Sequence, residues 1–148
     1  MQNNDVIRSL RYTFDFGDDQ MIKIFNLAEL EVTRAEVSDW LKRDDDPEAQ
    51  PISDFKLAVF LNGLITYKRG KKEGPQPVPE SRLTNNQIIR KIKIALKLQT
   101  EDIIEILALA GRNMSKHEIS AFFRKPDQHQ YRLCRDQVLR NFLQGLQK

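Results

Sequence analysis

Apolar residues recur every three to four positions along most of this 148-residue chain, which is the spacing of one face of an α-helix. The first such stretch begins at Asn3 or Asn4, since asparagine is a favoured helix cap, and it carries Val6, Ile7 and Leu10. No segment shows sustained alternation bounded by hairpin turns, so strands are not expected. The pattern predicts an all-α protein.

The same pattern returns 82 residues later without a gap. Between residues 4–66 and 86–148, 16 of 63 aligned pairs are identical. This period is longer than the roughly 20–50 residues of solenoid repeats, so it predicts a doubled domain and not an array. We expect a tandem duplication of a roughly 60-residue four-helix unit. The predicted parts are a first helical repeat at 1–67, a Pro/Gly/Lys-rich linker at 68–84 and a second helical repeat at 85–148.

Each copy offers start signals for further helices. The second helix opens after Asp18 or Thr100 with acidic residues in its first turn, as the helix dipole favours. The third begins with a capping box, Thr33 to Glu36 in one copy and Ser115 to Glu118 in the other. The prolines of the linker exclude a helix there and predict an extended, semi-rigid spacer. Apolar residues at helical spacing predict the fourth helix, and these are Leu57, Phe60, Leu61 and Leu64, with Leu139, Phe142, Leu143 and Leu146 in the second copy.

Charge is what the two copies do not share. Residues 1–66 carry 7 basic and 13 acidic side chains, a net charge of −6, whereas residues 86–148 carry 12 and 6, a net charge of +6. Residues 67–85 add 5 basic and 2 acidic side chains. Such a dipole could bind the halves to each other, pair two molecules head to tail, or direct the basic half at a polyanion.

Few residues suggest chemistry. A single cysteine, Cys134, excludes an internal disulfide or a thiolate metal cluster within one chain. His117 and His129 occur only in the second copy, without a carboxylate or cysteine at ligand spacing. No phosphate-binding loop or metalloprotease motif is present. We therefore expect no enzymatic activity, no cofactor and no metal. The absence of a long apolar run and of a signal peptide predicts a cytoplasmic protein without membrane contact.

Three identical pairs are candidates for structural roles in both copies: Arg8 with Arg90, Asp54 with Asp136, and Gly63 with Gly145. The charged pairs either contribute inter-helix salt bridges or dipole contacts, or form a ligand-binding pair that is used twice. Each glycine either marks a close approach of two helices or ends its helix as a C-cap.

The stretch from Leu27 to Leu41 resembles the helix-turn-helix of phage-repressor-type proteins, in which a capped second helix enters the major groove of DNA. Capped helix pairs of this shape are also common in other all-α proteins. Helix-turn-helix-like third helices and the basic second copy together predict phosphate contacts. The alternative is a solvated basic face opposed by the acidic first half. The predicted nucleic-acid-binding residues are Lys93, Lys97, Lys116, Arg124 and Lys125, with Lys71 and Lys72 in the linker.

Three motifs in this order resemble one bacterial family. They are Asn4-Asp5-x-Ile7-Arg8-Ser9-x-Arg11-Tyr12, then Phe60-Leu61-Asn62-Gly63-Leu64-Ile65 with Lys68-Arg69-Gly70-Lys71, and finally Cys134-x-Asp136-Gln137-x-Leu139-Arg140-x-Phe142-Leu143. The chain is similar over its whole length to the YehS-like proteins, a family of unknown function. The resemblance implies a small cytoplasmic protein of Gram-negative bacteria with two copies of the domain, and it implies no activity, cofactor or catalytic residue.

Two hypotheses of function follow. The first is a non-enzymatic binding module, associated with nucleic acid through the basic second repeat. The alternative is a protein–protein interaction or scaffold protein, in homodimeric form or with another partner, that has no role with nucleic acid.

Overall fold

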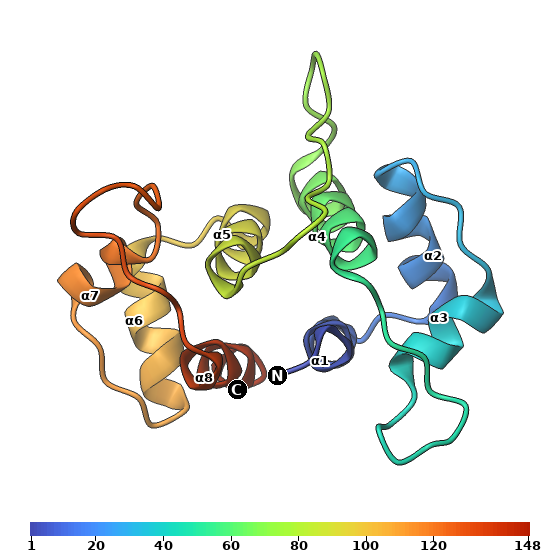
Figure 1. The fold of residues 1–148 in the computed structure, drawn as a ribbon, viewed down its shortest axis with the longest axis horizontal. Helices are drawn as coiled ribbons and strands as arrows, with labels where there is room; N and C mark the ends of the chain where they lie inside the picture. Colours follow the sequence, from blue (N-terminus) through green and yellow to red (C-terminus); the bar gives the residue numbers. More distant parts are fainter. The chain divides into compact units, whose positions relative to one another are not determined.

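A computed structural model describes all 148 residues and shows eight α-helices and no strand (Figure 1). The chain divides into two compact units, a first unit of Met1–Leu83 and a second unit of Thr84–Lys148. Each unit contains four helices, so the prediction of an all-α tandem duplication is confirmed. The helices are α1 (Asn3–Phe14), α2 (Asp18–Leu27), α3 (Arg34–Leu41) and α4 (Asp54–Arg69), then α5 (Asn85–Leu96), α6 (Thr100–Leu109), α7 (Lys116–Ala121) and α8 (Asp136–Leu146).

The capping boxes predicted for the third helices are confirmed. In α3 the Thr33 hydroxyl accepts a hydrogen bond from the backbone N–H of Glu36, and the Glu36 carboxylate accepts one from the backbone N–H of Thr33. Ser115 and Glu118 form the same reciprocal pair at the start of α7. These bonds satisfy donors that a helix start would otherwise leave unpaired, so they fix where each third helix begins.

The prediction of asparagine caps for the first helices was wrong. The residues at the N-cap positions are Gln2 for α1 and Thr84 for α5, and both asparagines of each copy lie inside the first turn. From there an asparagine side chain cannot cap its own helix. The asparagine side chains bond instead with the loop that precedes the fourth helix of their unit.

The core of the first unit forms where α2 packs across α3 and α4. Phe25 of α2 lies between two aromatic rings, with ring centroids 5.4 Å from Trp40 of α3 and 5.2 Å from Phe60 of α4. All three side chains are buried. Aromatic contacts of this size carry much of the burial energy of a small core.

In the second unit α6 packs against α8 and α7, and α5 packs against α8. Both units bring the second and fourth helices together at a glycine. A Cβ atom added at Gly63 would lie 1.9 Å from the carbonyl oxygen of Ile24, and one at Gly145 would lie 2.0 Å from that of Ile106. Of the two roles that the sequence leaves open for these glycines, the geometry is that of a close approach of two helices.

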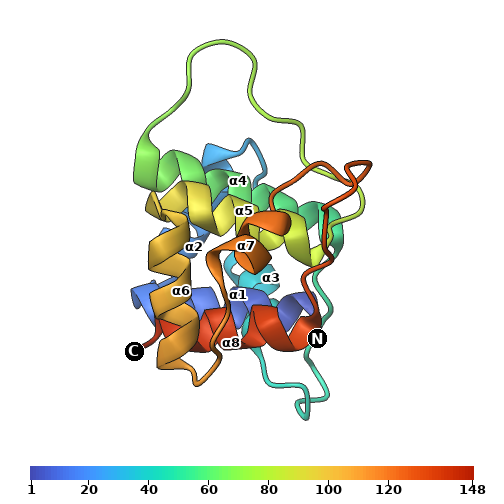
Figure 2. The same cartoon turned by 90° about the vertical axis from the view of Figure 1, so that its left-hand side faces the viewer.

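The linker returns along the helix that it leaves. Lys68 and Arg69, which the prediction placed in the linker, form the last turn of α4, and the helix ends at Gly70 with a positive φ of 86°. Residues 70–83 contain no helix and belong to the first unit. Figure 2 shows this segment arching away from the end of α4 and back. Its last residue, Leu83, donates a backbone hydrogen bond of 2.9 Å to the carboxylate of Asp54, at the first turn of α4.

Candidate nucleic-acid interface

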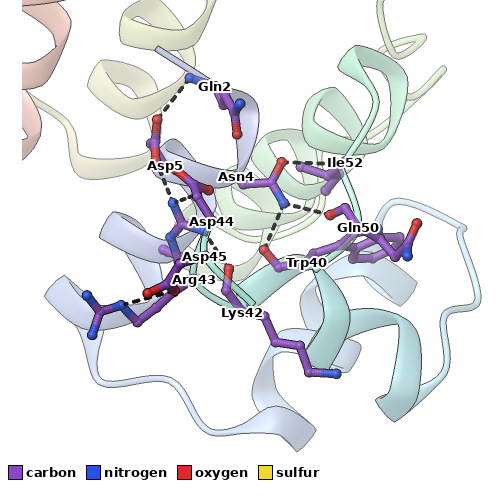
Figure 3. Close-up of polar contacts among 11 residues, drawn as sticks. Gln2, Asn4, Asp5, Trp40, Lys42, Arg43, Asp44, Asp45, Gln50 and Ile52 are labelled. Atoms are coloured by element: carbon purple, nitrogen blue, oxygen red, sulfur yellow. Dashed lines mark hydrogen bonds and ion pairs between the residues drawn. The ribbon is translucent and has the colours of Figure 1, made fainter. Parts of the chain in front are cut away.

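A buried asparagine fixes the loop between α3 and α4 in the first unit (Figure 3). The side-chain amide of Asn4 donates to the carbonyl of Trp40 at 2.9 Å and to that of Gln50 at 2.8 Å. Its side-chain oxygen accepts from the backbone N–H of Ile52 at 3.1 Å. One side chain thus takes the place of three backbone partners and holds both ends of the loop against α1.

The second unit repeats this arrangement at equivalent positions. Asn86 donates to the carbonyls of Phe122 and Arg132 at 3.1 and 2.7 Å, and it accepts from the N–H of Cys134 at 2.8 Å. Cys134 itself is buried, and burial raises the pKa of its thiol to about 12. The two loops therefore start from the same framework, and differences between them come from their side chains.

A second duplicated contact holds the start of the fourth helix. The amide of Asn3 donates to Asp54 at 2.7 Å, and that of Asn85 donates to Asp136 at 2.7 Å. The hydrogen bond from Asn85 holds the pKa of Asp136 below its usual value. Asp54 accepts additionally from Leu83. These aspartates bind amides, and neither of them pairs with the arginine that the sequence singled out beside it.

In the first unit that arginine, Arg8, is surrounded by acceptors. Its guanidinium donates to the carbonyl of Lys42 at 2.6 Å, to the carboxylate of Asp5 at 2.5 Å and to that of Asp44 at 3.3 Å. Its side chain is only 22% exposed. Two carboxylates thus neutralise one guanidinium at the edge of the loop.

In the second unit Arg90 keeps the backbone contact without the carboxylates. It donates to the carbonyl of Phe123 at 2.5 Å and forms no ion pair. Gln87 stands where the first unit has Asp5, and its side-chain oxygen accepts from the N–H of Thr84. Pro126 stands where the first unit has Asp44. Arg90 is therefore exposed, and no carboxylate neutralises its positive charge.

The residue after the third helix shows the same change. Lys42 bonds with the carboxylate of Asp39 at 2.6 Å and with that of Glu48 at 3.3 Å. These contacts, chiefly the hydrogen bond with Asp39, hold the pKa of Lys42 above its usual value. The first unit thus neutralises a second loop cation with acidic side chains of its own.

The corresponding residue of the second unit, Arg124, has no such partner. Ala121 and Gln130 occupy the two positions that carry carboxylates in the first unit. Arg124 forms no ion pair, and its Nε is buried without a hydrogen-bond partner. A buried unpaired donor costs free energy that the isolated protein does not recover.

Four cations of the second unit contact Phe123 or follow it directly in the chain. Arg90 binds the Phe123 carbonyl, Lys93 lies 5.4 Å from the centre of the Phe123 ring, and Arg124 and Lys125 follow Phe123 in the chain. We call Arg90, Lys93, Arg124 and Lys125 the basic cluster. Arg124 lines an open hollow of about 300 Å³ together with Gln128, His129 and Gln130. A hollow at a different place in the first unit, of about 400 Å³, is lined by Arg8, Arg43, Asp44 and Asp45.

The remaining predicted contacts are not members of the basic cluster. Lys97 is exposed at the C-terminal end of α5, one turn beyond Lys93. Lys116 is held by Glu101 of α6 at 3.0 Å. Lys71 and Lys72 are exposed in the segment that follows α4, within the first unit.

The geometry of the third helices differs from that of a helix-turn-helix. The connection between α2 and α3 runs over residues 28–33 and that between α6 and α7 over 110–115, so each has six residues. A helix-turn-helix uses a turn of about three or four. The second residue of each connection is left-handed, Glu29 with a φ of 66° and Gly111 with a φ of 83°. With only six residues, α7 is short for a helix that reads a DNA groove.

Comparison with known proteins agrees with the doubled architecture. The sequence matches the family described as "Protein of unknown function (DUF1456)" twice, over residues 3–70 and 85–148, and the chain belongs to this family. The resemblance inferred from the sequence motifs is thereby confirmed.

One relative is the "Uncharacterized protein YehS" of Escherichia coli (strain K12), which is 41% identical over 147 residues, or 99% of this chain and 94% of the relative. No solved structure matches the chain. None of the eight helices is both long and apolar enough to cross a membrane.

Proposed function

We propose that this protein is a cytoplasmic, non-enzymatic binding module that associates with nucleic acid through the basic cluster of its second unit. The observation that supports this is the selective loss of carboxylates. Five acidic positions around the loop of the first unit are neutral in the second, whereas the loop cations stay cationic in both. The acidic residues are Asp5, Asp39, Asp44, Asp46 and Glu48, and their counterparts are Gln87, Ala121, Pro126, Gln128 and Gln130.

Cations that are not neutralised within the protein favour an external polyanion. Arginine binds phosphate oxygens through two parallel donors, and lysine adds positive charge beside it. Each contact with a DNA phosphate releases condensed counterions, which makes the affinity strongly dependent on salt. The one acidic residue left in the loop is Asp127, and no ion pair joins it to the basic cluster.

The proposal places the contact at the basic cluster and not along α7. Lys116, the first residue of α7, is already paired with Glu101, and α7 has only six residues. The expected mode is therefore backbone recognition with little dependence on base sequence. Lys97 extends the same stripe of α5 by one turn and would add a further phosphate contact.

Binding of fluorescently labelled duplex DNA, single-stranded DNA and RNA, measured by anisotropy at about 50 mM salt and again at higher salt, tests the proposal. We expect micromolar binding that weakens steeply with salt. A variant with the four residues of the basic cluster changed to glutamine should bind weakly, and its salt slope should fall by about 1 for each lost contact.

The matched control removes the same charge from the first unit, with Lys23, Arg34, Arg43 and Arg69 changed to glutamine. It should bind almost as the unmodified protein does. If neither nucleic acid binds at low salt with micromolar protein, or if both variants lose affinity equally, the basic cluster is not a nucleic-acid interface.

The opposite net charges of residues 1–66 and 86–148 favour one other candidate, a head-to-tail self-association or protein scaffold. Sedimentation at low and high salt distinguishes the two. A salt-sensitive dimer that forms without nucleic acid would support the scaffold, and a strict monomer at high concentration would exclude self-association.

A further inference from the structure

We propose that Arg90 is the centre of a phosphate-binding subsite, whose anion position is filled in the first unit by the protein's own carboxylates. The subsite rests on the nucleic-acid role proposed above, because it names the group that the basic cluster would bind. It also makes a separate claim: a single phosphate is recognised at a defined place, beyond the diffuse attraction between a basic surface and a polyanion.

The first unit shows what the framework accommodates. Both carboxylates that contact Arg8 bond with the same terminal nitrogen, Nη2, while Nη1 donates to the backbone carbonyl of Lys42. Asp5 comes from α1 and Asp44 from the loop, so two separate elements supply acceptors to one guanidinium. Together they place two negative charges at one terminal nitrogen of the guanidinium.

The second unit has the arginine without this charge. Arg90 also uses one terminal nitrogen for a backbone carbonyl, that of Phe123, one position earlier in the loop than the carbonyl that Arg8 binds. Its other donors bind no protein group. Neither replacement residue can act as the lost acceptor, because Pro126 has no polar side-chain atom and the Gln87 oxygen is used by the cap at Thr84.

Arg124 adds a second guanidinium on the same loop, although its counterpart Lys42 pairs with Asp39 and Glu48 and not with the carboxylates at Arg8. Arg124 lies next to Phe123 in the chain, so the carbonyl that Arg90 binds is the one that joins Phe123 to Arg124. Burial of its Nε without a partner leaves the positive charge partly desolvated. A phosphate on the terminal nitrogens would offset this cost by its charge.

The expected ligand is a phosphate group and not a lone carboxylate. Two carboxylates place two negative charges beside Arg8, which matches the charge of about −1.5 to −2 on a monophosphate, free or at the end of a nucleic-acid strand, more closely than the single charge of one carboxylate or one backbone phosphodiester. Lys93 and Lys125 stand beside the two arginines and favour the more highly charged anion. The phosphate could belong to a nucleic acid or be free in solution, and the experiment separates these sources.

Inorganic phosphate is the first probe. The arginine side-chain Nε–H signals of the whole protein, followed by NMR during titration with phosphate at constant ionic strength, should shift for Arg90. Arg90→Gln should weaken phosphate binding by about tenfold or more, the change that corresponds to the loss of one charged hydrogen bond, and Arg124→Gln should weaken it less. Thermal melting shows whether each variant still folds.

The decisive variant restores the acids of the first unit. Gln87→Asp combined with Pro126→Asp gives the second loop the pair that Asp5 and Asp44 provide in the first, and it should abolish the phosphate response while the fold persists. Asn113→Asp combined with Gln144→Asp is the matched control, since both residues are exposed, lie away from the basic cluster and change the net charge equally. The control should lower phosphate affinity by less than about twofold.

An oligonucleotide and a glutamate peptide of equal charge complete the test. Phosphate binding that the oligonucleotide displaces supports the subsite and the nucleic-acid role together. Phosphate binding without oligonucleotide binding supports the subsite as a site for free phosphate and refutes the proposed function. Oligonucleotide binding with no response of Arg90 to phosphate overturns the subsite alone. Tighter binding of the glutamate peptide than of the oligonucleotide also overturns it, because a carboxylate would then be the ligand.

Discussion

Gly63 has no space for a methyl group, and its replacement by alanine tests how closely α2 and α4 approach. The added Cβ would lie 1.9 Å from the carbonyl oxygen of Ile24 and 2.9 Å from its carbonyl carbon. These are backbone atoms of a helix, so no side-chain rotation relieves the overlap. The two helices would have to separate by more than about 1 Å, and a gap of that size already forfeits a quarter to a half of each neighbouring dispersion contact.

Two effects of opposite sign set the magnitude. Alanine is favoured over glycine in a helix interior by about 1 kcal/mol, whereas overpacking a well-packed core costs typically about 1–3 kcal/mol and occasionally more. Because the obstacle here is backbone, we expect the upper end of that range and a net destabilisation of about 2–3 kcal/mol. A unit of this size is stable by only about 4–12 kcal/mol, so the change is large.

Urea unfolding followed by far-UV circular dichroism measures the effect. Gly63→Ala should lower the midpoint of the transition of the first unit, and Gly145→Ala, with its Cβ 2.0 Å from the Ile106 carbonyl oxygen, should do the same in the second. Gly17→Ala is the control, since no atom lies within 4 Å of its added Cβ. If Gly63→Ala unfolds at the urea concentration of the unmodified protein or above it, the inference of a close backbone approach is wrong.

Three further predictions concern the framework of the second unit and the turns. Asn86→Ala should destabilise the protein by about 2–4 kcal/mol in urea unfolding, because it leaves buried backbone groups without partners; a loss under about 0.5 kcal/mol would contradict the clamp. Glu29→Gly should stabilise the protein by about 1 kcal/mol and raise its melting temperature, because a residue other than glycine is strained in the left-handed conformation. Gly111→Ala should destabilise the protein by a similar free energy and lower its melting temperature. The pKa of Glu118 lies below its usual value, chiefly through the hydrogen bond from the backbone N–H of Ser115. Its stabilising contribution is therefore present above the unfolded-state pKa and is lost as pH falls through the lower, folded-state pKa. Glu118→Gln should consequently be less sensitive than the unmodified protein to acid below about pH 4.5, in urea midpoints measured across that range.

Local signals in the sequence were sufficient for the helices. Periodicity and the capping boxes depend on residues three or four positions apart, and they predicted all eight helices and the start of α3 and α7. Asn4 was assigned to a cap by its local preference, although it also lies three residues before Ile7 and therefore on the buried face of α1. That spacing was the signal that could have identified it as a core residue.

Contacts between distant residues could not be predicted in the same way. Lys116 pairs with Glu101, fifteen residues earlier, a contact that the sequence analysis did not predict. The first unit has the equivalent pair, Arg34 with Asp19, so comparison of charged positions between the copies would have indicated it. Arg90 was assigned a structural role because both copies have an arginine there, whereas its surroundings differ and its twin is neutralised.

The hydrogen bond between Leu83 and Asp54 ties the end of the linker to the first turn of α4. Both ends of the segment are attached to α4, at Arg69 and at Asp54, so the distance it must span is the length of this 16-residue helix, about 24 Å. Residues 70–83 could reach about 46 Å when extended, nearly twice that distance. The helix, and not the composition of the linker, therefore sets where the linker ends. The arch has slack enough to absorb deletions or accept an inserted peptide, which makes it a natural place for an engineered label or a new chain terminus.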